Sequence, residues 1–85
     1  MQTAYLVVPF ERVGMKVGAR QAMMVDAASK ARLIARTLAQ QVAGVAVLER
    51  KLDPDSGDGI DTLLESHGVL PPAFPDGTDW TVTLN

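Results

Sequence analysis

The chain has 85 residues and a mass of 9.1 kDa, which is enough for one small domain spanning residues 1–85. Hydrophobic residues make up 47% of it and charged residues 21%, a mixture typical of globular rather than disordered or fibrous proteins. The longest apolar run, residues 4–10, is far shorter than the roughly 20 residues that a membrane-spanning helix needs, so no membrane partner is expected. Cysteine is missing, which excludes disulfides, thiolate metal sites and a cysteine nucleophile.

Charge is divided unevenly along the chain, although the net charge is only -2. Residues 1–52 hold all eight basic residues and three acidic ones, whereas residues 53–85 hold seven acidic residues and no lysine or arginine. Such a split hints at nucleic-acid contact or at an acidic segment that masks a basic surface. The alternative is that the two halves pack together and neutralise each other.

Two further features of the sequence concern the cellular compartment of the protein and the genome that encodes it. The N-terminal residues lack the basic region of a secretory signal, which favours a cytoplasmic protein. Eleven alanines, a single asparagine and more arginine than lysine are typical of a GC-rich bacterial genome.

The first half of the chain predicts two strands and a long helix. Residues 4–10 form a β-branched, aromatic-containing run that predicts a strand, and the glycine-containing residues 11–18 predict a turn or loop. Residues 19–25 fit a second strand that pairs with the first, or else the beginning of the helix. From residue 27 to residue 43 the apolar side chains recur on one helical stripe, with Asp26 as the expected N-cap and Gly44 as the expected left-handed C-terminal residue.

The second half predicts shorter elements. Residues 45–52 predict a strand, and residues 53–59 predict a turn rich in aspartate, glycine and proline. The apolar spacing of residues 60–67 favours a short helix, and the alternative is a strand that returns from a hairpin with residues 45–52. Residues 80–84 alternate like a final edge strand. Together these elements predict a two-layer α+β domain, with a mainly antiparallel sheet of 3–5 strands and one long helix (about residues 26–43) packed across it.

Six basic side chains are candidates for a nucleic-acid surface: three in or near the first predicted loop (Arg12, Lys16 and Arg20) and three on the polar side of the predicted helix (Lys30, Arg32 and Arg36). One shared basic surface would attract a phosphate backbone by releasing its counterions. Against this reading, the isoelectric point is about 5.1, and none of the four aromatic residues is interleaved with the basic ones. Nucleic acid is therefore an alternative partner and not the favoured one.

The aspartate-rich turn is the best candidate for a metal or small-ligand site. Its candidate ligands are Asp53, Asp55 and Asp58, because hard cations such as calcium want several oxygen ligands on a tight turn. The spacing does not follow the EF-hand rule, since the glycine and the final glutamate are not in their required places. The favoured interpretation is a solvated turn, so neither a metal nor another cofactor is expected.

A small group of apolar residues is a candidate contact patch: Leu33, Met23, Met24 and Trp80. The only histidine, His67, has no evident nucleophile or orienting carboxylate on the predicted short helix, so it suggests a structural residue rather than a general base. A chain of this size builds a catalytic pocket with difficulty, and an enzyme is the least expected class. The sequence favours a small non-enzymatic module that contacts another protein or a second copy of itself, including a homodimer.

Overall fold

The computed structural model describes residues 2–71 and 74–75 of the chain. They form five strands and one helix: β1 (Gln2–Val13), β2 (Lys16–Ala19), β3 (Met23–Val25), α1 (Ala28–Leu38), β4 (Gly44–Leu52) and β5 (Gly59–Gly68). Among these residues, the eleven-residue α1 is too short and too polar to cross a membrane.

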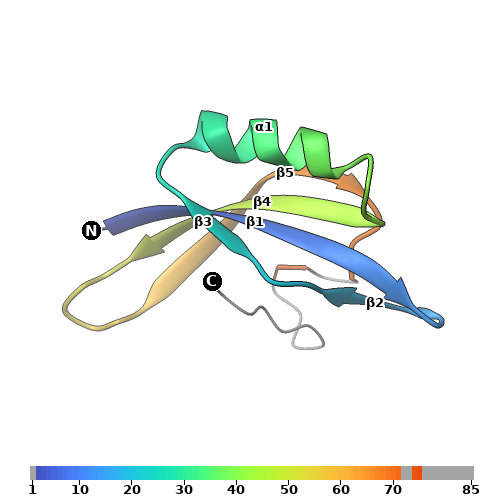
Figure 1. The fold of residues 1–85 in the computed structure, drawn as a ribbon. Coiled ribbons are helices and arrows are strands. Elements are labelled where there is room, and N and C mark those ends of the chain that lie inside the picture. Colours follow the sequence, from blue (N-terminus) through green and yellow to red (C-terminus); the bar gives the residue numbers. More distant parts are fainter. Residues whose placement is uncertain (1, 72–73, 76–85) are drawn as a thin grey trace.

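All strands belong to one antiparallel sheet built around β1. Strands β2 and β3 pair in succession along one edge of β1, whereas β4 pairs along the other edge and β5 lies outside β4. The helix lies over one face of this sheet (Figure 1). This arrangement confirms the predicted α+β class with an antiparallel sheet.

One face of the sheet packs against α1. Ala31 and Ala35, one helical turn apart, are fully buried against Val7, Val45 and Val47 of the central strands. Because an alanine projects only a methyl group, the helix axis can come close to the sheet. The alternation along β1 and β4 supplies this apolar face and a second one behind it.

The second face of the sheet is also apolar, because β1 and β4 carry apolar side chains on both of their faces. Leu6, Val8, Phe10 and Leu48 are fully buried there, and the segment after β5 contributes the buried Phe74. The rings of Phe10 and Phe74 meet edge to face, with centroids 5.0 Å apart and planes at 84°. Leu70, which is partly buried, and Phe74 thus bring the segment after β5 into the core of this face.

The helix is shorter than predicted, and both of its predicted caps are wrong. It begins after Ala27 without a side-chain cap, and Asp26 instead forms an ion pair with Lys30. It ends at Leu38 because the following residues turn back toward β4. Gly44 belongs to β4, where a Cβ would lie 1.9 Å from the carbonyl oxygen of Val69, so its role is close backbone approach rather than helix termination.

The predicted short helix at residues 60–67 is wrong, and the alternative strand is confirmed as β5. A bulge explains the misleading spacing, because Leu63 lies opposite Leu48 while Glu65 lies opposite Val47. Leu64 is the extra residue, and it interrupts the strict alternation of a strand. Ladder hydrogen bonds with β4 decide the conformation where the local pattern does not.

The remaining predictions differ from the structure mainly in their bounds. Residues 19–25 are extended rather than helical, with β2 ending at residue 19 and β3 covering residues 23–25. The loop predicted at residues 11–18 is a two-residue turn, Gly14 and Met15, because Val13 pairs directly with Lys16. A positive φ of 64° at Gly14 suits this tight reversal. The strand predicted at residues 80–84 lies outside the described residues.

Candidate interaction surface

The six candidate nucleic-acid residues do not form one surface. They lie on the helix, beside Glu11, and at the β1–β2 turn. The three helix cations each lie beside a carboxylate: the Lys30 Nζ is 3.0 Å from Asp26, and both Arg32 and Arg36 approach Glu65. Arg20 pairs with Glu11 near the other end of the helix. Of these pairs, those of Arg32 and Arg36 with Glu65 join the basic half of the chain to the acidic half, whereas Lys30–Asp26 and Arg20–Glu11 lie within residues 1–52.

Glu65 of β5 is the centre of a polar cluster that also contains Arg32, Arg36 and His67. It accepts hydrogen bonds from the Arg36 Nε and Nη2 at 3.3 and 3.2 Å, and from the His67 Nε2 at 2.7 Å, while the Arg32 Nε lies 3.8 Å away. The hydrogen bond from His67, followed by that from Arg36, holds the pKa of the Glu65 carboxyl below its ordinary value. This cluster ties the helix to the outermost strand.

Glu65 and His67 meet because β5 is a strand, in which residues two apart share a face. The sequence prediction missed this pair because it placed both residues on a helix. The hydrogen bonds of His67 in the described part of the chain involve no serine, threonine or other nucleophile. Both side chains of the pair lie on the helix side of the sheet, where Arg36 also reaches Glu65.

A second ion pair lies on the opposite face of the sheet. Arg50 of β4 donates from its Nε and Nη2 to the two carboxylate oxygens of Asp61 on β5, at 2.7 and 2.9 Å, and both side chains are about three-quarters buried. The hydrogen bond with Asp61 raises the pKa of the Arg50 guanidinium. Such a bidentate ion pair has a specific geometry, and it supports the register in which Arg50 lies opposite Asp61.

Arg12 and Lys16 differ from the other cations. Of the eight basic residues, these two have no carboxylate partner among residues 2–71 and 74–75. They flank the β1–β2 turn and line one cleft of about 740 Å³. Its other described lining residues come from the turn, from β2 and from the segment after β5: Met15, Val17, Val69, Leu70 and Pro71.

Apolar side chains are exposed at the same end of the molecule. Met15 is fully exposed at the tip of the turn, Val13 is 72% exposed beside it, and Val69 is 37% exposed across the cleft. We call this combination of the β1–β2 turn and residues 69–71 the hairpin end. Exposed apolar patches that are rimmed by polar residues mark interaction sites on soluble proteins.

The aspartate-rich turn joins β4 to β5 at the opposite end. Asp53 uses its Oδ1 to accept a hydrogen bond from the Asp55 amide at 2.9 Å, and the Asp58 amide donates to the Ser56 hydroxyl at 3.2 Å. Across the described residues, no group of three or more acidic or histidine side chains is arranged to hold a metal ion. The carboxylates of this turn cap local amides or face solvent.

The predicted apolar patch is only partly exposed. Leu33 is 67% exposed on the outer side of α1, and Met24 is 56% exposed on β3. Met23 instead packs into the core beneath the helix, on the other side of the strand from Met24. Trp80 lies outside the described residues, so these four do not define a surface.

None of the protein families, curated proteins or solved structures with which the chain was compared matches it. The arguments about its function therefore come from the geometry of its own residues. The sequence analysis named Arg12 and Lys16 of the hairpin end but not its exposed apolar residues. Their signal was Gly14 between Val13 and Met15, two large apolar residues of a predicted turn.

Proposed function

We propose that this domain is a non-enzymatic module that binds another protein surface, acidic and partly apolar, at its hairpin end. The observation that carries the proposal is the coincidence there of two cations without an ion pair to the described residues, three exposed apolar side chains and a cleft. Arginine and methionine are enriched in protein interfaces, and charged residues around an apolar centre form their usual rim.

Charge supports an acidic partner. A cation already paired with a carboxylate has little left to gain from a second one, whereas Arg12 and Lys16 have no such partner among the described residues and can attract an incoming anionic group. The apolar residues around them supply the non-directional part of binding. Together, the cations and the apolar side chains favour a protein surface over a purely ionic ligand.

The outer edge of β5 is less suited to the same role. Natural sheets block unwanted edge pairing with charged side chains and bulges. Strand β5 carries Asp61 and Glu65, both held in ion pairs, and has a bulge at Leu64. These features support the hairpin end as the contact surface.

Crosslinking from one exposed position tests the proposal. A photoreactive amino acid replaces Met15 in one variant and Leu33 in a control, because both side chains are exposed and apolar but lie on different elements. Position 15 is expected to form a discrete protein adduct. The adduct should appear in an extract of the source cells if the partner is another protein, and with the purified chain alone if the partner is a second copy. Neutralising the charges with Arg12→Gln and Lys16→Gln should reduce that adduct at least threefold. Adducts that form equally from both positions, or from neither, would contradict the proposal.

Nucleic acid and calcium are the rival ligands, and each has its own test. Because Arg12 and Lys16 are the two cations without an ion pair to the described residues, binding to DNA should change about tenfold between roughly 50 and 200 mM salt, far less than for a dedicated binder. A DNA affinity with a steep salt dependence would favour the nucleic-acid function. A thermal shift with calcium that disappears in Asp55→Ala would favour the metal site.

A further inference from the structure

We propose that the occupant of the hairpin-end cleft is the aspartate-rich turn of a second copy, so that the chains associate head to tail. This inference rests on the proposed function and names the partner of the same surface. It follows from what lies at the two ends of the sheet.

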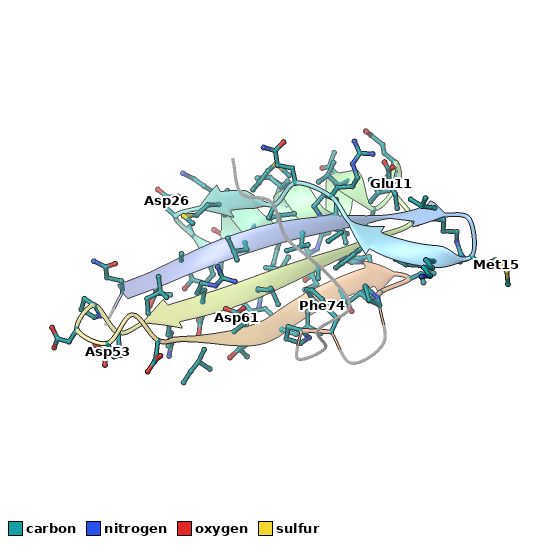
Figure 2. The ribbon with its side chains drawn as sticks, turned by 90° about the horizontal axis from the view of Figure 1, so that it is seen from below. Glu11, Met15, Asp26, Asp53, Asp61 and Phe74 are labelled. Atoms are coloured by element: carbon teal, nitrogen blue, oxygen red, sulfur yellow. The ribbon has the colours of Figure 1, made fainter. Side chains whose placement is uncertain are left out.

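The hairpin end and the aspartate-rich turn lie at opposite ends of the sheet. Strand β1 begins beside Leu52, which leads into the acidic turn, and finishes at the β1–β2 turn. Figure 2 shows Asp53 at one end of the long strands and Met15 at the other. The molecule is 41 Å long but only 20 Å thick, so the two surfaces cannot meet within one copy.

The acidic turn is held in one conformation by its own backbone hydrogen bonds. The Gly57 amide donates to the Asp53 carbonyl at 2.8 Å, and the Asp53 amide donates to the Asp58 carbonyl at 2.9 Å, which closes the loop on itself. A preformed loop loses little conformational entropy when it binds. The exposed carboxylates of Asp55 and Asp58 form no ion pair with the described residues.

The two ends complement each other in charge and in hydrophobicity. Nearby cations do not neutralise the turn, because Lys51 pairs with Glu49 and Arg50 with Asp61. Directly after the turn, Ile60 is 67% exposed. The acidic end therefore offers carboxylates and one large apolar side chain, and the hairpin end offers cations and exposed apolar side chains.

A contact between two different surfaces leaves one free site at each end of every assembly. Such heterologous contacts extend into open chains unless their rotation closes a ring. Because the charged groups are exposed, the association should be weak and strongly dependent on salt. The Debye length is about 30 Å at 0.01 M ionic strength and about 8 Å at 0.15 M.

Sedimentation velocity of the purified full-length chain tests the inference. At about 0.01 M ionic strength the weight-average mass should rise with protein concentration past that of a dimer, and it should fall toward that of a monomer at about 0.15 M. Lys16→Gln should weaken the association at least threefold. Lys30→Gln removes the same charge from the helix and should leave it unchanged.

Mixing two neutralised variants distinguishes head-to-tail contact from a symmetric dimer. The hairpin variant carries Arg12→Gln and Lys16→Gln and keeps its acidic turn, and the turn variant carries Asp55→Asn and Asp58→Asn and keeps its hairpin end. Each alone should stay monomeric. Mixed in equal amounts they should form one contact, and the mass should stop at that of a dimer.

Two results would overturn the inference. The first is a wild-type chain that stays monomeric at low salt, and the second is a dimer of fixed mass whose formation ignores the turn variant. A position-15 adduct with a different protein, together with either of these, would leave the proposed function standing and remove only the head-to-tail contact.

Discussion

Replacing the buried Gly44 with alanine should strongly destabilise the fold. The new Cβ would lie 1.9 Å from the Val69 carbonyl oxygen, although real Cβ atoms essentially never come closer than 3.0 Å to another atom. The backbone at Val69 must therefore move by about 1 Å. That shift also strains the hydrogen bond from the Val69 amide to the Ala43 carbonyl, now 3.0 Å long.

The expected loss follows from these two effects. Overpacking in a tight site costs about 1–3 kcal/mol, and a weakened backbone hydrogen bond costs about 1 kcal/mol more. Gly44→Ala should thus lower the free energy of unfolding by about 2–4 kcal/mol. For a domain of this size that lowers the melting temperature by about 8–30 °C.

Thermal and urea unfolding monitored by circular dichroism measure this effect. Gly18→Ala is the matched control, because Gly18 also lies in a strand and a Cβ there would have no neighbour within 4 Å. The control should change the free energy of unfolding by no more than about 0.5 kcal/mol. Equal stability of the two variants would refute the close approach of Gly44 to Val69, and with it the position of one wall of the cleft.

Three further perturbations test the core and the ion pairs. Phe74→Ala should lower the free energy of unfolding by about 3 kcal/mol, and Phe74→Leu by about 1 kcal/mol, because leucine keeps apolar volume but loses the ring contact with Phe10; urea unfolding measures both. Asp61→Asn should cost about 1–2 kcal/mol through its largely buried pair with Arg50, and a double-mutant cycle with Arg50→Gln should show the coupling. Glu65→Gln should flatten the acid dependence of stability, measured by urea unfolding at a series of pH values.

The direction of this pH effect follows from the lowered pKa of the Glu65 carboxyl. Its ion pairs stabilise the folded chain above the ordinary glutamate pKa of about 4.3, and that contribution is lost as the pH falls through the lower, folded-state pKa. Parallel pH profiles for the wild type and Glu65→Gln would show that the cluster with His67 and Arg36 contributes nothing to folding.

Much of the fold could be predicted from the sequence because its main signals are local. The apolar run at residues 4–10 and the alternation at residues 45–52 lie in β1 and β4, and the alanine stripe lies in α1. The failures have non-local causes. Leu64 enters β5 as a bulge that imitates helical spacing, and Gly44 is required by a segment twenty-five residues further along the chain.

The candidate site could be predicted only in part, because charge counts do not show which charges meet. The sequence placed Arg12 and Lys16 among six basic residues, but only the fold shows that Glu65 approaches Arg32 and Arg36. Contacts between residues far apart in the sequence decide which cations already have a carboxylate partner within the fold. Only the folded structure shows that the β1–β2 turn and residues 69–71 line the same cleft.

An amide-resolved NMR dilution series of the purified chain, at about 0.01 M and about 0.15 M ionic strength, tests the central claim most directly, since it reports which residues meet a partner. The account predicts concentration-dependent shifts at residues 12–17 and 69–71, with matching shifts at residues 53–60, all of them smaller at the higher salt. Shifts confined to the edge strand β5 or to the outer side of α1 would contradict it, as would spectra that do not change with concentration.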